Sequence, residues 1–314
     1  MTDAIEHTRA VTFTGQPLTV RIEQPADGRL LGLVVLIHGM AEHHGRYDNV
    51  SRLLTDEGFA VARFDLPGHG RQAQLANCLG HFADQAAEQM VVADLRELFR
   101  LLRARFPDTP RVLLGHSMGS LLARRALLHS GDTFAGCVLS GTVGKNRQGS
   151  LGRVLAGLIA RLRGPRHVSP LLTAMLKNSY GKHRRGNAWL SRDENVVAAY
   201  NADPLCGFPL TASSLQAMLA WAGRTATADG IKGMPADCRY LLLSGTADPV
   251  GGYGRGVSWL EDQMTSVGLN VTCHLYPDAR HEVFNELNRL DVYADLLDFL
   301  KSVAQEQPPI GGNT

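Results

Sequence analysis

Short apolar runs and segments with helical spacing alternate along most of the chain. The apolar runs have the length of single β-strands and lie at residues 30–37, 59–64, 112–114, 134–139, 239–244 and 270–276. Other segments carry apolar side chains at steps of three and four, the spacing of an amphipathic helix, and these are residues 47–58, 83–106, 118–128, 254–268 and 283–304. The pattern therefore predicts strands and helices in regular alternation.

The kind of apolar run predicts where a strand lies in its sheet. Residues 30–37 are almost continuously apolar, which is typical of a strand covered by helices on both faces. Residues 11–14 and 18–22 instead alternate apolar with polar around Gly15-Gln16-Pro17, which predicts a hairpin at a half-exposed sheet edge. We expect an α/β fold with a mainly parallel central sheet flanked by helices, and functional groups at the carboxyl ends of its strands.

The alternation stops in the middle of the chain. No strand-like run occurs over residues 144–225, while residues 151–162 and 170–176 have helical spacing. This predicts an inserted helical cap at residues 144–225, between a first core part at 1–143 and a second at 226–304. Residues 305–314 are rich in Pro and Gly, and we expect a flexible tail there.

The predicted cap has an unusual charge pattern. Residues 145–192 contain eleven Lys or Arg and no Asp or Glu. One interpretation is a solvated face or loop, which is the ordinary role of a charge run. The other is a basic surface that makes transient contact with a membrane or meets an acidic substrate.

Composition limits the classes of protein that remain. A chain of 314 residues with 44% apolar and 20% charged residues is an ordinary globular protein, and a net charge of +2 is too small to indicate nucleic-acid binding. The five cysteines are scattered and never form C-x-x-C, which disfavours a disulfide framework and a zinc site. Residues 1–10 are polar and no apolar run approaches the roughly 20 residues of a membrane span, so we expect a cytoplasmic protein.

The turn after the run at residues 112–114 carries the strongest chemical signal. Its sequence is Gly115-His116-Ser117-Met118-Gly119, a G-x-S-x-G between a predicted strand and a predicted helix. A serine on such a strained turn needs glycines two residues away on either side, because side chains there would collide with the adjoining strand or helix. We expect Ser117 to be a nucleophile.

A serine nucleophile needs a base, and the base needs a carboxylate. His281 and Asp248 both follow predicted strands directly, which places them at the sheet edge where Ser117 is expected. His116 is a weaker candidate because a residue beside the serine points elsewhere. Asp278 and Glu282 are weaker acids because they lie in the same loop as His281. The predicted catalytic residues are therefore Ser117, Asp248 and His281.

An acyl-transfer site also needs donors for the oxyanion. The backbone N–H of Met118 at the helix start is one candidate, and that of Met40 in the His38-Gly39-Met40 loop is the other. We expect His38, which follows the same buried strand, to line the substrate pocket.

Six segments together resemble a known family. They are His38-Gly-Met-Ala-Glu-His-His-Gly-Arg-Tyr47, Phe64-Asp-Leu-Pro-Gly-His-Gly70, Gly115-His-Ser-Met-Gly119, Ala202-Asp-Pro-Leu205, Gly245-Thr-Ala-Asp248 and Ala279-Arg-His-Glu-Val-Phe-Asn-Glu286. In order, they resemble the motifs of the serine-aminopeptidase-like α/β-hydrolases, which include monoacylglycerol lipases and lysophospholipases. The resemblance implies an α/β-hydrolase fold, a Ser-Asp-His acyl hydrolase, a helical cap over the pocket, and no cofactor or metal.

We therefore expect a serine hydrolase that cleaves carboxylic esters of monoacylglycerol or lysophospholipid type. Leu151, Leu155 and Leu158 in the predicted cap suit an acyl chain, although packing of the cap on the body explains them equally well. Two alternatives remain. One is an aminopeptidase-like enzyme or small-molecule esterase with the same triad, and the other is a non-catalytic binding protein. The sequence does not indicate the oligomeric state.

Overall fold

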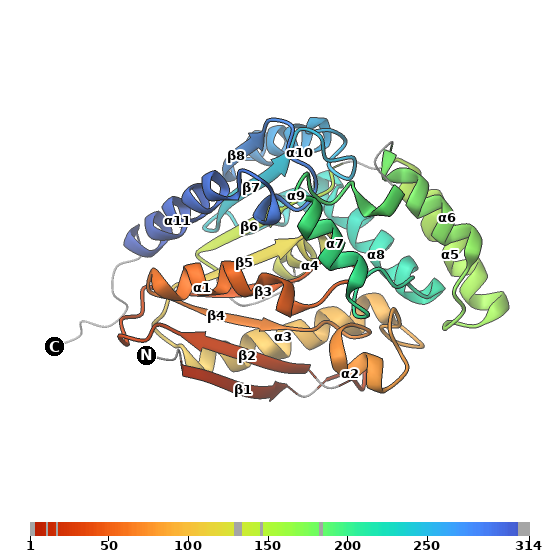
Figure 1. The fold of residues 1–314 in the computed structure, drawn as a ribbon, viewed down its shortest axis with the longest axis horizontal. Helices are drawn as coiled ribbons and strands as arrows, with labels where there is room; N and C mark the ends of the chain where they lie inside the picture. The colour runs from red at the N-terminus through yellow and green to blue at the C-terminus, as the bar shows by residue number, and fades with distance from the viewer. Residues whose placement is uncertain are drawn as a thin grey trace.

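The computed structural model describes residues 4–306 except residues 11, 17, 129–133, 145–146 and 182–184. Its centre is an eight-stranded sheet with the strand order β1-β2-β4-β3-β5-β6-β7-β8 (Figure 1). The first two strands are antiparallel, and β3 to β8 are parallel. The parallel strands are β3 (Gly32–Ile37), β4 (Phe59–Phe64), β5 (Arg111–His116), β6 (Gly136–Ser140), β7 (Arg239–Gly245) and β8 (Asn270–Tyr276). The predicted α/β class and mainly parallel sheet are confirmed.

The edge hairpin exists, but the prediction of its first strand at residues 11–14 is wrong for residues 12–14, which are not in a strand. Strand β1 is Ala4–Ala10, and it pairs with β2 (Leu18–Gln24) from Ala4 opposite Gln24 to Ala10 opposite Leu18. Residues 12–16 form the connecting loop, and residue 11 lies outside the described residues. The loop is held from outside the hairpin, because the backbone N–H of Phe13 and the hydroxyl of Thr14 both donate to the buried Asp94 carboxylate.

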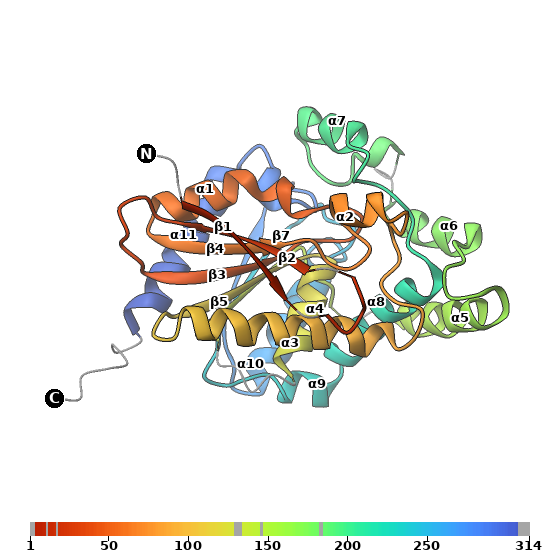
Figure 2. The ribbon, with the colours of Figure 1, turned by 90° about the horizontal axis from the view of Figure 1, so that it is seen from below.

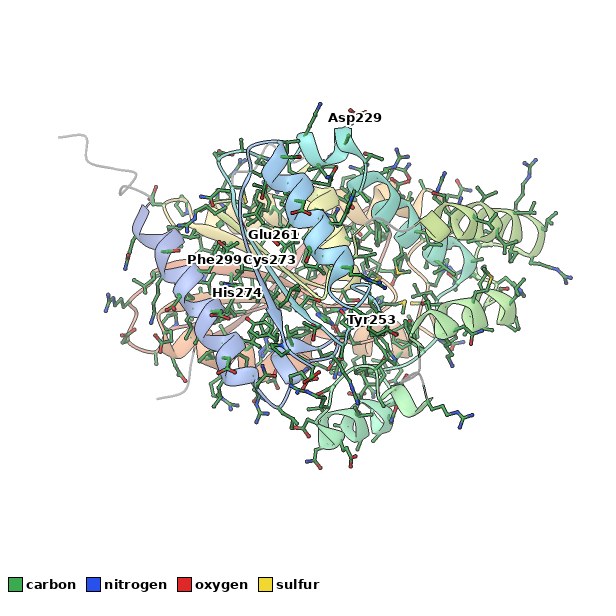
Figure 3. All side chains as sticks on the ribbon, turned by 90° about the horizontal axis from the view of Figure 1, so that it is seen from above. Asp229, Tyr253, Glu261, Cys273, His274 and Phe299 are labelled. Atoms are coloured by element: carbon green, nitrogen blue, oxygen red, sulfur yellow. The ribbon has the colours of Figure 1, made fainter. Side chains whose placement is uncertain are left out.

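Helices cover both faces of the sheet. Figure 2 shows α1 (Asp48–Asp56) and α11 (Arg289–Glu306) on one face, with α3 (Ala87–Arg105) and α10 (Arg255–Ser266) on the other. Each layer encloses its own apolar core, so strands such as β3 and β5 are buried along their whole length. At the β8 edge, Figure 3 shows Cys273 and His274 on β8, between Glu261 of α10 and Phe299 of α11.

Only helices and turns occur among the described residues between β6 and β7. They are α5 (Arg147–Arg163), α6 (Pro170–Ser179), the 3-10 turn η3 (Arg185–Asn187), α7 (Glu194–Ala202), α8 (Ala212–Thr225) and α9 (Ala228–Lys232). Helices α5 and α6 project from one end of the molecule, at the right of Figure 1. Helix α8 instead packs against α3 and α4 (Met118–Leu127), and its Trp221 is fully buried and stacks on Phe82.

A buried arginine on α4 hydrogen-bonds to the chain after β6 and to the end of α8. Arg124 on α4 is fully buried, and its guanidinium donates to the carbonyls of Val143 and Thr225. Val143 precedes the predicted cap and Thr225 is its last predicted residue, and the boundaries at residues 144–225 remain a prediction. At the other end of the chain, residues 305 and 306 belong to α11, and the remainder of the predicted tail lies outside the described residues.

Three further elements are short. Helix α2 (Gly70–Leu75) and the 3-10 turns η1 (His44–Tyr47) and η4 (Val283–Asn285) lie in loops after strands. Over the described residues, no helix combines the length and the apolar character needed to cross a membrane.

Candidate active site

Ser117 occupies a strained turn between β5 and α4. Its φ is 51° and its ψ is −116°, a left-handed conformation that L-residues rarely adopt. A Cβ on Gly115 would lie 2.5 Å from the carbonyl oxygen of Gly119, and a Cβ on Gly119 would lie 2.2 Å from that of Ile37. The two glycines therefore allow the close contacts of the turn, as the G-x-S-x-G pattern predicts.

Asp248 and His281 are brought together by neighbouring strands. Strands β7 and β8 pair up to Gly245 opposite Tyr276, so the loops that follow begin side by side. These loops touch closely, since the Ala247 N–H donates to the Ala279 carbonyl at 2.9 Å. The His281 Nδ1 lies 3.0 Å from the Asp248 Oδ2, and both side chains are buried.

The contact with Asp248 determines which ring nitrogen of His281 carries the proton. Because Asp248 is a carboxylate, the Nδ1 carries the proton and donates it, and the Nε2 is left as the proton acceptor. Burial acts against the imidazolium, but the charge of Asp248 and its hydrogen bond outweigh burial and raise the pKa of His281 above its usual value. A neutral Nε2 beside a carboxylate-held Nδ1 is what a general base requires.

The competing groups have other partners. Asp278 is exposed, and the carboxylate on the His281 Nδ1 is that of Asp248. Glu282 accepts from both terminal nitrogens of Arg46. His116 lies with its ring centroid 4.8 Å from that of His281, and burial together with the His281 charge lowers its pKa to about 4. It is therefore a neutral neighbour of His281.

The loop after β3 lies directly beside Ser117, because Ile37 pairs with Gly115 across β3 and β5. Its backbone is fixed on both sides of Met40. The Gly39 N–H donates to the buried Glu42 carboxylate, the Gly39 carbonyl accepts from His38, and the Ala41 N–H donates to His69. Within the described part of the chain, the Met40 N–H has no hydrogen-bond partner. The Met118 N–H is likewise available because it lies in the first turn of a helix.

One cavity connects these groups. It has a volume of about 160 Å³, and Ser117, His281, Met40 and Met118 all line it. Most of its wall is apolar, supplied by Leu121 and Val143 of the body and by residues of α6 and α8 such as Leu176, Met218 and Leu219. Glu42, His116 and Glu282 add polar groups. The arrangement can bind an apolar chain beside a serine and a histidine.

Four residues predicted to bind substrate are not among those that line this cavity. His38 is fully buried, and its Nε2 accepts from the Leu66 N–H, so it supports the loop instead. Leu151 and Leu158 are 71% and 52% exposed on the outer surface of α5. Leu155 is half-buried and packs against the core. Helical spacing identified the apolar face of α5 but not the direction in which it points, because that depends on how the helix docks.

Several residues at the site were missed by the sequence analysis. Arg46 has 11% of its side chain exposed and joins the buried Glu42 and Glu282, both of which line the cavity. Burial alone would raise the pKa of Glu42, but the charge of Arg46, with His116 and His38, lowers it to about 2. Trp189, Tyr180 and Tyr200 close the cavity from the cap side. The spacing of Glu42 and Arg46 was the available signal for the pair, while nothing in the pattern indicated the aromatic residues.

Among the described residues, His43, Asp203 and Cys206 form a group with the chemistry of metal ligands. The His43 Nε2 is 2.8 Å from the Asp203 Oδ2, a hydrogen bond that joins the loop after β3 to the loop after α7. Burial raises the pKa of Cys206 to about 12, so its thiol is protonated. The hydrogen bond between His43 and Asp203 therefore joins two loops. That the protein needs no metal remains a prediction.

Comparisons with known proteins agree with this geometry. The family model described as "Serine aminopeptidase, S33" matches residues 28–288. A monoacylglycerol lipase of Mycolicibacterium smegmatis is 29% identical over 281 residues, which cover 86% of this chain and 88% of that protein. A carboxyl esterase of Bacillus coagulans, solved with glycerol, superimposes with a TM-score of 0.89 at 25% identity over 96% of this chain and all of that chain. A structure described as an open form of a lipase gives the same TM-score at 29% identity and the same coverage of both chains.

Proposed function

Since the chain belongs to the serine aminopeptidase S33 family, we propose that it is a carboxylic ester hydrolase of monoacylglycerol or lysophospholipid type that acts through an acyl-Ser117 intermediate. One observation carries the proposal. Ser117 sits on a strained turn in the same cavity as His281, whose Nδ1 is held by the buried Asp248. The family and the lipase and esterase relatives support an ester-hydrolysing serine hydrolase over a non-catalytic binding protein.

The proposed reaction has two halves. The Ser117 Oγ attacks the ester carbonyl carbon while its proton passes to the His281 Nε2, and the oxyanion accepts hydrogen bonds from the Met40 and Met118 N–H groups. When the C–O bond of the ester breaks, His281 returns the proton to the leaving alcohol. A water molecule then gives a proton to His281 and attacks the acyl-serine carbonyl. The C–O bond to Ser117 breaks, His281 returns the proton to the Ser117 Oγ, and the acid is released.

The cavity supports a lipid ester as the substrate. An acyl chain needs an apolar wall, which Leu121, Leu176 and Met218 supply near Ser117. An aminopeptidase would need a carboxylate for the substrate ammonium group. The two acidic residues of the cavity, Glu42 and Glu282, already accept hydrogen bonds from Arg46 and other protein donors. These contacts favour the ester over the amino-terminal peptide.

A substrate panel with an active-site label tests this proposal. We expect the protein to hydrolyse nitrophenyl esters and a monoacylglycerol, to leave an amino-acid arylamide largely intact, and to be labelled by a fluorophosphonate at Ser117. Ser117→Ala is the matched control. Label on a peptide without Ser117, or faster cleavage of the arylamide, would contradict the proposal.

We further propose that the helical segment at residues 144–225 is a cap that makes transient contact with anionic membranes. Helix α5 exposes Leu151, Val154, Leu158 and Leu162 along one stripe, and Arg153, Arg161 and Arg163 are exposed on the same helix. Arg166, by contrast, is paired with Asp84. The scattered cysteines, all of them free, keep the cytoplasm as the expected compartment.

Replacing Arg161 and Arg163 by Gln tests the membrane contact. A basic residue near an anionic surface contributes roughly 1 kcal/mol. We therefore expect several-fold slower hydrolysis of a monoacylglycerol in phosphatidylglycerol vesicles at low salt, and an unchanged rate on soluble nitrophenyl butyrate. Arg52→Gln with Arg100→Gln, on α1 and α3, removes the same charge elsewhere and should not slow the vesicle reaction. If both double variants lost the same fraction of the vesicle rate, the basic residues of the cap would be an ordinary solvated face.

A further inference from the structure

The cap segment at residues 188–192 is joined to the loop that carries His281 by its backbone. The His281 N–H donates to the Trp189 carbonyl at 3.3 Å, and the Glu282 N–H donates to the Leu190 carbonyl at 2.8 Å. The Arg280 guanidinium donates to the carbonyls of Ala188 and Ser191 at 2.6 and 3.0 Å. The base loop is therefore held by the cap on one side and by the Asp248 loop on the other.

Glu286 anchors this junction. Its side chain is fully buried, and its carboxylate accepts from the N–H groups of Arg280, Arg192 and Leu287 at 2.8 to 3.0 Å. It also accepts from the Arg192 Nε at 2.9 Å. One buried carboxylate thus binds backbone of both the cap and the base loop, so the two segments hold a fixed register.

The junction places an aromatic ring against the base. The Trp189 indole lies 4.9 Å from the His281 imidazole, centroid to centroid, with 38° between the planes. Its orientation is fixed by Tyr180, which stacks on it at 4.0 Å and 15°. The indole is 7% exposed, and its N–H has no acceptor in the described part of the chain. Packing rather than hydrogen bonding therefore holds this ring beside His281.

We propose that Trp189 is a positioning residue for His281, held there by the cap junction, and that its π face favours the imidazolium formed when Ser117 gives up its proton. The inference rests on the proposed role of His281 as the base. A cation within about 6 Å of an indole centroid is attracted by roughly 0.5–2 kcal/mol. Here the attraction exists only while the His281 imidazole is protonated. It therefore stabilises the transition state more than the resting enzyme.

Other groups also act on His281 and must be kept constant. Asp248 holds its Nδ1, the charges of Glu282 and Glu42 favour the imidazolium, and the neutral His116 ring lies on another side. None of these residues changes when Trp189 is replaced. The indole also buries His281, and less burial would raise the pKa of His281. A shift of the profile to lower pH in a Trp189 variant therefore reports the loss of the π face.

The test compares Trp189→Leu with Trp189→Phe on nitrophenyl acetate, whose short acyl group needs little of the apolar wall. We expect Trp189→Leu to lower kcat about tenfold and to move the acid limb of the profile to lower pH, because the imidazolium has lost its partner. Trp189→Phe keeps a ring without the unpaired N–H, so kcat and the limb should stay within about twofold and close to the wild type.

Controls separate the possible failures. Leu176→Ala opens the same cavity from α6 and should leave the pH midpoint where it is. If Trp189→Leu does not fold, Trp189→Met provides the same loss of the ring. A non-aromatic variant with the wild-type midpoint overturns the inference, whether or not kcat falls. Full activity in His281→Ala would instead overturn the proposed function itself.

Discussion

Replacing Arg46 should destabilise the fold, because its side chain pairs two buried carboxylates at the site. Its guanidinium lies 2.6 Å from Glu42 and 2.5 Å from Glu282, and both carboxylates are at least nine-tenths buried. Arg46→Ala leaves two buried charges without their partner, a change that costs about 3–5 kcal/mol. For 314 residues with an unfolding entropy of about 2.1 cal/mol/K per residue, each kcal/mol corresponds to about 1.5 °C. The expected fall in Tm is therefore about 5–8 °C.

The pH dependence shows whether charge is the cause. In the wild type the pKa of Glu42 is lowered to about 2, so its ion pair stabilises the fold above the usual carboxyl pKa and is lost only as the pH falls toward 2. In Arg46→Ala the unpaired carboxylate is destabilising when ionised, so the deficit in Tm should shrink between pH 7 and pH 5. Calorimetry at both pH values measures this.

Two controls accompany the Arg46 experiment. Arg100→Ala removes an exposed arginine that pairs with Glu97 and should leave Tm unchanged within error. Arg46→Met combined with Glu42→Gln and Glu282→Gln removes all three charges, and most of the lost stability should return. A deficit that is the same at both pH values, or that persists in the triple variant, would refute the argument from buried charge.

The remaining predictions concern catalysis. Ser117→Ala and His281→Ala should each lower kcat by on the order of 10⁴-fold, and the double variant should lose little more, because the residues act as a unit; multiplicative losses in ester assays would contradict this. Asp248→Asn should keep the fold but lower kcat by a similar order, because the imidazole loses its oriented tautomer, and Asp278→Asn is the matched control. The rate should rise with pH through a midpoint above the usual histidine value, because Asp248 raises the pKa of His281 and only the neutral base accepts a proton. A flat profile from pH 5 to 8 would exclude His281 as the base.

Much of the central fold was predictable from the sequence because buried parallel strands are apolar throughout. The predicted range 59–64 coincides with the buried strand β4, and the range 30–37 contains the buried strand β3. The range 270–276 also coincides with β8, although this edge strand is partly exposed. The edge hairpin was harder, because residues 4–10 mix polar and apolar side chains and become a strand only by pairing with β2. Helix α8 packs both on α5 and on the body helices α3 and α4, and its Trp221 is buried against the body, a contact that helical spacing does not reveal.

The same distinction separates the residues of the candidate site into those placed by local structure and those placed by helix packing. Residues whose chemistry depends on a local turn or on a strand end, such as Ser117, Asp248 and His281, could be named from their positions after apolar runs. Residues that depend on docking could not. Leu158 and Leu176 are both apolar residues on helices of the cap segment, yet the first faces outward and the second lines the cavity. That difference depends on how each helix packs against parts of the chain that are distant in sequence. The local pattern of apolar residues does not encode this packing.

The strands and the cap segment hold different parts of the candidate site. The strands fix Ser117 and the Met40 loop through the pairing of Ile37 with Gly115, and they fix Asp248 through the pairing of Gly245 with Tyr276. The cap segment also holds the His281 loop, through the backbone of Trp189. It contacts the Met40 loop as well, because the Gly207 N–H and the Tyr200 hydroxyl both donate to the Ala41 carbonyl. Changes on the exposed face of α5 should therefore alter how a substrate arrives, while changes at residues 188–192 should alter how the base works, so the two parts of the cap are separable by kinetics.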